Sequence, residues 1–325
     1  MKSFDHTVVR IVMAGVLTAV AGTTAAQQSY PSKPIRFMTP FVPGGTTTIL
    51  ARLVGQKLTE SWGQQVVVDN RPGGNTVIGT EALAKSAPDG YTILLTGSSH
   101  TLIPQLQTVS YDPIKDFAPV ATLAKTETVL VINASVPANN LQEFIALAKS
   151  KPGQLNYATP STGGPLHLAT EMFNIMAGTK MQHIAYKGAG QGLIDLIGGQ
   201  VQLYFITSAA YVPHSKNGKL RAIATTGETR MAALPAVPTF AEAGLPGFDM
   251  RTWFGVLAPA GTPKAIIDKL ATEIARYLTQ PDFKEKLISQ GADPFVLTPE
   301  QYAALMKADM AKFAKVIKTA NIKLD

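Results

Sequence analysis

Two stretches of the chain place a pair of glycines and several small hydroxyl side chains just ahead of a helix-like segment. They are PFVPGGTTTILARLV at residues 40–54 and YATPSTGGPLHLATEMF at residues 157–173. Free main-chain N–H groups and the positive end of the helix dipole favour an anion at such a junction. One glycine pair alone is equally typical of a plain turn, so the repetition carries the argument. We expect the two helix starts to bind one carboxylate between them.

A third stretch of small polar residues, TGSSHTL at residues 96–102, follows a strand-like run. Ser98 or Ser99 with His100 supplies the side chains of a nucleophile and its base, so an exported hydrolase is one interpretation. Adjacent residues rarely present both side chains to one point, which favours a ligand contact. The chain also lacks a G-x-S-x-G elbow and a Walker A lysine, and KGAGQGL at residues 187–193 does not fit G-x-G-x-x-G. We therefore predict a protein that is not an enzyme and that needs no cofactor.

His167 and Glu171 are four residues apart, which is a spacing compatible with metal ligands on one helix face. No third ligand is evident nearby, so a helix-capping or surface pair is the default interpretation. We expect no metal site and assign no role to His183 or His214.

Strand-like and helix-like segments alternate along the chain, which predicts an α/β fold. The β-prone runs lie at residues 35–41, 65–69, 91–96, 129–133, 155–158, 201–206, 220–225 and 253–257. Helical spacing of apolar residues follows the first run, and further helices are expected at residues 141–150 and 165–177. Near the end, Thr262 is a predicted N-cap, and Thr298 with Gln301 forms a predicted capping box.

The alternation predicts two α/β lobes, each a mostly parallel sheet with flanking helices. Lobe 1 consists of residues 27–128 and 248–325, and lobe 2 of residues 129–247. The chain is expected to pass from lobe 1 to lobe 2 and back again. This arrangement leaves a cleft between the lobes, where small ligands usually bind.

Composition narrows the classes of partner. The formal net charge is +7, but the lysines are spread without a basic block, so we expect no nucleic-acid partner. The chain has no cysteine, which rules out disulfides, thiolate metal ligands and cysteine nucleophiles.

The first 26 residues are typical of a cleaved signal peptide. Lys2 and Arg10 flank a charge-poor leader, residues 11–21 are apolar, and Thr24-Ala25-Ala26 supplies small residues for cleavage. The apolar run is short for a membrane span, although an uncleaved anchor is the alternative. We expect an exported, periplasmic protein.

Six segments in order resemble the Bug family, the extracytoplasmic substrate-binding receptors of tripartite tricarboxylate transporters. The segments cover residues 30–58, 66–95, 111–121, 155–173, 186–205 and 234–248, and they include VVVDNRPGGNTVIGTEALAKSAPDGYTILL and YKGAGQGLIDLIGGQVQLYF. The resemblance implies a two-lobed periplasmic binding protein of type II-like architecture that closes on a small carboxylate. It implies membrane transporter subunits as partners, and we expect a monomer. A protein that reports its ligand to a sensor is a further alternative.

The resemblance also implies which residues line the cleft. The predicted ligand-binding residues are Val42, Pro43, Gly44, Gly45, Thr46, Thr48, Ser98, Ser99, His100, Thr159, Ser161, Thr162, Gly163, Gly164, Lys187, Gly188, Ala189 and Thr207.

Two positions depart from the family pattern, since members often carry Asp where this chain has Thr48 and Ile206. An acidic residue in the cleft would attract the ammonium group of a ligand or repel a second carboxylate. Thr48 therefore argues for a dicarboxylate or an aromatic acid over an amino acid, whereas the change at Ile206 adds little.

Overall fold

A computed structural model describes residues 30–43, 46–186, 189–231, 233–248, 250, 252–289 and 292–323, with the main chain alone at residue 209. Residues 33–325 form one compact unit. The expected signal peptide at residues 1–26 lies outside the described residues. Within the described part of the chain, no helix is both long enough and apolar enough to span a membrane.

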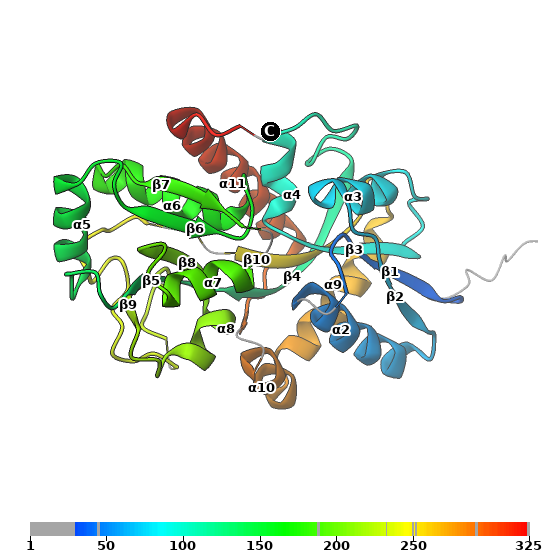
Figure 1. The fold of residues 1–325 in the computed structure, drawn as a ribbon. Coiled ribbons are helices and arrows are strands. Elements are labelled where there is room, and N and C mark those ends of the chain that lie inside the picture. The colour runs from blue at the N-terminus through cyan, green and yellow to red at the C-terminus, as the bar shows by residue number, and fades with distance from the viewer. Residues whose placement is uncertain are drawn as a thin grey trace, which may run out of the picture. The chain divides into compact units, whose positions relative to one another are not determined.

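The first of two sheets has six strands in the order β11-β4-β10-β3-β1-β2 (Figure 1). Its strands are β1 (Ile35–Thr39), β2 (Val66–Asn70), β3 (Thr92–Gly97), β4 (Phe117–Thr126), β10 (Thr252–Pro259) and β11 (Asp293–Pro294). The α-helices in the same parts of the chain are α2 (Thr46–Trp62), α3 (Val77–Ala84), α4 (Ser99–Leu102), α9 (Lys264–Leu278), α10 (Pro281–Ser289) and α11 (Pro299–Ala320). Short 3-10 turns occupy Gly74–Thr76 and Ile103–Gln105.

The second sheet has five strands in the order β7-β6-β8-β5-β9. Its strands are β5 (Thr128–Asn133), β6 (Asn156–Thr159), β7 (Gln182–Ala185), β8 (Leu203–Thr207) and β9 (Leu220–Thr225). The helices are α5 (Leu141–Ser150), α6 (Pro165–Ala177), α7 (Ala189–Ile197), α8 (Ser208–Tyr211) and the 3-10 turn Val212–His214. The two-lobed α/β fold is thus confirmed, with one sheet in each lobe.

Both sheets are mixed, which corrects the expectation of mostly parallel sheets. The predicted β-α-β-α-β run does form parallel pairs, β1 with β2 and β1 with β3. Strand β10, however, runs antiparallel to β3 and β4, and β5 runs antiparallel to β8 and β9. The long strand β4 leads directly into β5, and β10 returns beside β4. The strands that connect the two sheets are therefore antiparallel to their neighbours, β10 in the first sheet and β5 in the second.

The main chain passes from the first sheet to the second at Glu127, between the last residue of β4 and the first of β5. We call residues 126–128 the crossing. The main chain of Glu127 accepts a hydrogen bond from the Ser208 N–H at 2.9 Å, and the Thr226 hydroxyl accepts one from the Thr128 N–H, also at 2.9 Å. These bonds attach the crossing to the ends of β8 and β9. The predicted lobe bounds, 27–128 with 248–325 and 129–247, stay a prediction.

Two predicted helix caps had different outcomes. The capping box is confirmed, because the Thr298 hydroxyl accepts from the Gln301 N–H while the Gln301 side chain accepts from the Thr298 N–H. The Thr262 cap is wrong: its hydroxyl donates instead to the Pro259 carbonyl, and Pro263 occupies the N-cap position of α9.

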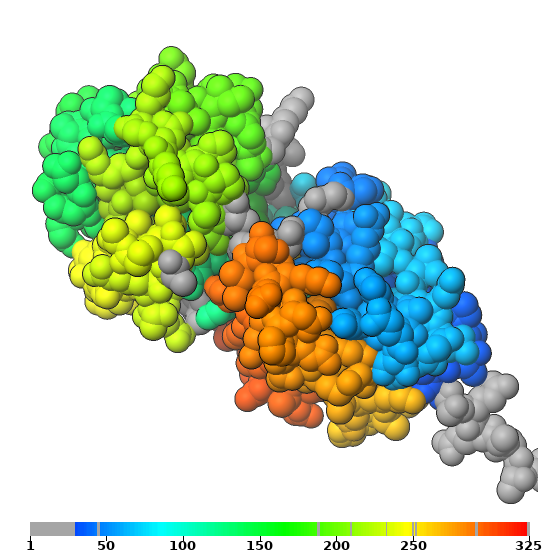
Figure 2. All heavy atoms as spheres, turned by 90° about the horizontal axis from the view of Figure 1, so that it is seen from below, coloured from blue at the N-terminus to red at the C-terminus, as the bar shows by residue number. Residues whose placement is uncertain are grey.

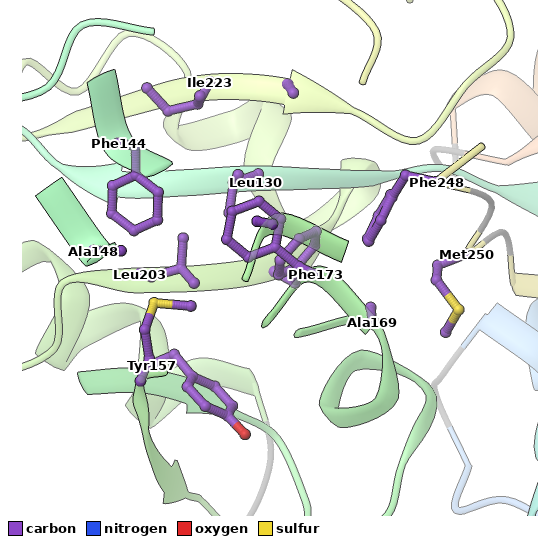
Figure 3. Packing of buried hydrophobic residues seen from close by; sticks show 14 of the residues in the cluster. Leu130, Phe144, Ala148, Tyr157, Ala169, Phe173, Leu203, Ile223, Phe248 and Met250 are labelled. Carbon is purple, nitrogen blue, oxygen red and sulfur yellow. The ribbon is translucent and has the colours of Figure 1, made fainter. Parts of the chain in front are cut away.

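A large apolar cluster lies between the second sheet and helices α5 and α6 (Figure 3). Phe144, Phe173 and Phe248 are all buried within it. Phe313 of α11 belongs to the same cluster, so the C-terminal helix shares the core of the second lobe. In the first lobe, Figure 2 shows orange α9 and α10 beside blue α2, where the Tyr277 hydroxyl donates to the Lys57 carbonyl at 2.8 Å.

Candidate functional site

The loop between β1 and α2 carries six of the predicted site residues. Val42 is 65% exposed, Pro43 is exposed, and Thr46 is the half-buried first residue of α2. Gly44 and Gly45 lie outside the described residues. The described part of the loop is therefore accessible.

Thr48, the sixth of these residues, is fully buried and its hydroxyl is engaged within the protein. The hydroxyl lies 2.8 Å from the Asn70 side-chain nitrogen, which donates to it, and 3.5 Å from the Val42 carbonyl, to which it donates. Asn70 also donates to the Phe41 carbonyl at 2.9 Å. Thr48 therefore attaches the loop to the end of β2 rather than presenting its hydroxyl to solvent. The argument that this position disfavours amino-acid ligands consequently loses its basis.

The loop between β6 and α6 carries the second predicted cluster. Thr159 ends β6 and is fully buried, whereas Ser161 is exposed and Thr162 is half-buried. Gly164 occupies the N-cap position of α6, with the predicted Pro165 in the first turn. No side chain makes a capping hydrogen bond to this helix start, and Ser161 is the exposed hydroxyl residue of the loop.

The amide of Gly163 is not the free donor that the sequence predicted. It donates to Nδ1 of His167 at 2.9 Å. His167 is only 6% exposed and stacks on His183, with 3.8 Å between the ring centroids. The structure thus places two histidines beneath this loop; the sequence predicted a helix-capping or surface role for His167 and assigned no role to His183. The spacing of His167 from Gly163 was visible, but the pairing of β6 with β7 was not, because β7 was not predicted.

Ser98, Ser99 and His100 lie at the end of β3, but they do not form a nucleophile–base pair. Nε2 of the fully buried His100 donates to the Pro113 carbonyl at 2.8 Å. Neither serine hydroxyl has a hydrogen-bond partner among the described residues. Burial lowers the pKa of His100 to about 4, which makes its imidazole a weak base. This geometry gives the hydrolase interpretation no support.

Among the buried hydroxyls that lack a hydrogen-bond partner within the described part of the chain, six belong to segments that end near the crossing. They are Thr96, Ser98, Ser99, Thr126, Thr128 and Thr225. Buried polar groups normally have partners, so this grouping indicates polar space that suits a ligand or ordered water.

The strand registers show how these strand ends lie relative to the crossing. Gly97 at the end of β3 pairs with Phe254 of β10, which pairs in turn with Ala124 of β4. Thr207 at the end of β8 pairs with Thr128 of β5. Adjacent strands lie about 4.8 Å apart, so the end of β8 lies beside the crossing, whereas the end of β3 is separated from β4 by β10.

Two of the four remaining predicted residues, Ala189 and Thr207, adjoin helix starts in the second lobe. Lys187 and Gly188 are outside the described residues, and exposed Ala189 begins α7. Thr207 is half-buried at the N-cap position of α8, where its side chain makes no capping hydrogen bond.

The helices that follow the predicted loops share an electrostatic feature. The first turns of α2, α6 and α7 contain no acidic residue. Helices α5, α10 and α11 carry Glu143, Asp282 and Glu300 in their first turns, whereas α3, α4, α8 and α9 also begin without an acidic residue. The acid-free starts leave the positive ends of the helix dipoles uncompensated, which favours an anionic ligand.

A cavity of about 540 Å³ borders the crossing at Glu127, and the sequence did not predict it. It is lined by Lys125, Glu127, Ser208, Val212, Pro213, Thr229, Arg230, Met231, Ala233, Ile288, Ser289, Ala292 and Asp293. Of the predicted site residues that the structure describes, none is in this lining. Its lining mixes both charges, and Arg230 is already paired with Glu242 at 3.0 Å. The predicted loops suit a carboxylate better, because acidic side chains are absent from their helix starts.

Comparison with known proteins identifies the family. The model of the tripartite tricarboxylate transporter family receptor matches residues 50–322. The chain belongs to this receptor family. Protein BugT of Bordetella pertussis is 37% identical over 319 residues, covering 97% of this chain and 98% of BugT. The resemblance to the Bug receptors is therefore confirmed.

Solved structures of receptor-family relatives have the same fold. A periplasmic transporter is 40% identical with a TM-score of 0.78, covering 91% of this chain and 100% of that one. Rpa4515 of R. palustris, solved with adipate, is 35% identical with a TM-score of 0.78 and coverages of 90% and 99%. MatC from Rhodopseudomonas palustris, solved with bound malate, is 29% identical with a TM-score of 0.73 and coverages of 89% and 100%. These relatives are solute-binding proteins, as the family assignment implies.

Proposed function

We propose that this protein captures a small dicarboxylate in the periplasm and delivers it to the membrane subunits of a tripartite transporter. The observation that carries the proposal is the group of buried hydroxyls without partners beside the crossing. A carboxylate is a pure acceptor and matches such donors. The helix starts at the predicted loops add N–H donors and bring no acidic side chain.

Dicarboxylates are favoured by the family relatives rather than by Thr48. Adipate and malate each carry two carboxylates, and they occupy Rpa4515 and MatC respectively. Hydroxyl and amide donors bind each carboxylate through hydrogen bonds and without an ion pair. The dicarboxylate is therefore held loosely enough to be released to the transporter. The expected signal peptide at residues 1–26 supports a periplasmic location, and the protein is proposed to act as a monomer.

A thermal-shift screen tests the ligand class. The panel contains malate, adipate, citrate, benzoate and glutamate, each against the mature protein at several concentrations. A ligand present at about 100 times its Kd stabilises the folded state by about 2.7 kcal/mol through mass action. We expect the largest shift with a dicarboxylate. A larger shift with benzoate or glutamate would reassign the ligand class, and no shift with any member would contradict carboxylate capture.

Two further measurements test delivery and catalysis. Uptake by vesicles containing the membrane subunits is expected to require both the receptor and the bound dicarboxylate. Uptake that is independent of the receptor would favour the sensor alternative. Release of p-nitrophenol from p-nitrophenyl acetate, if abolished by Ser98→Ala or Ser99→Ala, would instead revive the hydrolase interpretation.

A further inference from the structure

Three aromatic rings stack beneath the loop at residues 159–164. His167 comes from α6, while Tyr157 and His183 occupy paired positions in the parallel strands β6 and β7. The rings of His167 and His183 have centroids 3.8 Å apart and planes 16° apart. His183 stacks in turn on Tyr157 at 5.1 Å. We call His167 and His183 the imidazole stack.

The polar edges of the imidazole stack both contact the loop, and their partners fix the tautomers. Since the Gly163 amide donates to Nδ1 of His167 at 2.9 Å, that nitrogen carries no proton. The single hydroxyl proton of Thr159 goes to the Ser161 carbonyl at 3.0 Å, because a carbonyl only accepts. The Thr159 oxygen must then accept from Nε2–H of His183, which lies 2.5 Å away. Both rings therefore carry a proton on Nε2 when they are neutral.

Burial keeps the stack neutral. It lowers the pKa of His167 to about 3, with a smaller contribution from His183, and it lowers the pKa of His183 as well. Tyr157 packs on the His183 side of the imidazole stack. Its hydroxyl donates to Glu171, and burial raises the pKa of the Glu171 carboxyl. The acceptor at Nδ1 of His167 is thus available across the neutral range.

The loop is tight enough for these bonds to decide its shape. Gly163 has a φ of 70°, in the left-handed region. A Cβ at Gly164 would lie 2.6 Å from the Ser161 hydroxyl oxygen. The two histidines hold opposite ends of this turn, at Thr159 and at Gly163. Apolar rings of similar size would fill the same volume without fixing either end.

We propose that His167 and His183 are positioning residues that hold the 159–164 loop in the conformation that receives a ligand carboxylate. Exposed Ser161 and half-buried Thr162 are the groups that this conformation presents. The proposal rests on the proposed function for the role of the loop. The link between the stack and the shape of the loop is independent of any ligand.

Reciprocal substitutions separate hydrogen bonding from packing. In His167→Asn, the side-chain oxygen replaces the Nδ1 acceptor, whereas His167→Gln carries its amide at the position of Nε2 and leaves Gly163 unpaired. For His183 the order reverses, because His183→Gln keeps a donor near Nε2 and His183→Asn does not. Each histidine thus has one conservative and one disruptive variant. Circular dichroism and thermal melts establish that all four are folded.

The first readout needs no ligand. Amide hydrogen exchange at Gly163, followed by NMR, is expected to be about tenfold faster in His167→Gln than in the wild type, the change given by losing roughly 1.4 kcal/mol of hydrogen-bond stabilisation. Exchange in His167→Asn is expected to stay near the wild-type rate. Equal rates in both folded variants would overturn the role of His167 in shaping the loop.

The second readout is the affinity for adipate, measured by titration calorimetry, with malate as the second probe. His167→Gln and His183→Asn are expected to bind about tenfold more weakly, while His167→Asn and His183→Gln bind nearly as well as the wild type. Unchanged affinity in all four folded variants would overturn positioning, and so would equal weakening in all four, which indicates packing alone. If the wild type binds neither probe, the proposed ligand class fails while the exchange measurement still decides the loop's dependence on His167.

Discussion

The side-chain nitrogen of Asn70 lies 2.8 Å from the hydroxyl of Thr48, so the end of β2 is bonded to the first turn of α2. The same nitrogen lies 3.1 Å from the Thr39 hydroxyl at the end of β1. One amide thus connects two strand ends and a helix start. The first turn of α2 is thus attached to the ends of β1 and β2, while Val42 and Pro43 stay exposed and able to contact a ligand.

Thr48→Val tests this anchor. Valine keeps the branched shape but removes the acceptor for Asn70 and the donor to the Val42 carbonyl. We expect the free energy of unfolding to fall by about 1 kcal/mol, the usual net contribution of one hydrogen bond, because Asn70 keeps the Phe41 carbonyl and the Thr39 hydroxyl as acceptors. Urea unfolding measures the loss, and Thr48→Ser, which keeps the hydroxyl, is the matched control. A valine variant as stable as the serine variant would show that the anchor contributes nothing.

Gly164→Ala tests the turn at the start of α6. The added Cβ would lie 2.6 Å from the Ser161 hydroxyl oxygen, which is able to rotate away because Ser161 is exposed. We expect little loss of stability, roughly 0.5 kcal/mol, but about tenfold weaker dicarboxylate binding, since the displaced hydroxyl is a proposed ligand donor.

The control for Gly164→Ala is Ser161→Ala, alone and in combination. If both act through one hydroxyl, the double variant binds about as weakly as either single variant, because coupled sites are not additive. Additive losses in the calorimetric affinities would separate the two positions and contradict this mechanism.

Gly227→Ala tests the packing behind the crossing. A Cβ at Gly227 would overlap the carboxylate of Glu127, which is only 7% exposed. Overpacking of this kind costs about 1–3 kcal/mol, so we expect a lower Tm in a thermal melt. Gly218→Ala is the matched control, because a Cβ there has no heavy atom within 4 Å. Equal melting temperatures for the two variants would mean that Glu127 moves aside without cost.

The sequence predicted the local parts of this fold better than the distant ones. The parallel run from β1 to β3 follows from apolar periodicity in neighbouring segments, and the capping box at Thr298 depends on residues three apart. Strand β4 was not predicted, and its partner β10 lies more than a hundred residues later in the chain. The pairing that defines the crossing is therefore invisible to local patterns.

The candidate site shows the same limit. The glycine loops were recognised from composition. Which of their hydroxyl and N–H groups are already hydrogen-bonded depends on contacts that form only in the folded protein. Thr48 bonds to Asn70, which is 22 residues away, and the Gly163 amide bonds to His167. The hydroxyls beside the crossing come from strands that are distant in sequence. A sequence therefore identifies a donor-rich loop without showing which donors stay free.

Buried His100 is expected to make the free energy of unfolding fall in mild acid. Burial lowers its folded pKa to about 4 from an ordinary value of 6.5, so the unfolded chain binds the proton first as the pH falls. The stabilisation is complete above pH 6.5 and is lost as the pH falls toward 4. Between about pH 7 and pH 5 this one group costs about 2 kcal/mol, from roughly 1.4 kcal/mol for each pH unit below 6.5.

His100→Gln isolates this contribution, because glutamine retains a donor for the Pro113 carbonyl but does not titrate. His100 otherwise packs against the rings of Tyr111 and Phe117, which stay uncharged in this range. His167 and His183, whose pKa values are also lowered by burial, act in the same direction and remain in the variant. Glu171, whose pKa is raised, acts in the opposite direction and is also unchanged. Urea unfolding at pH 7 and pH 5 is therefore expected to show the wild type losing about 2 kcal/mol more than His100→Gln, whereas parallel losses would mean that His100 is protonated equally in both states.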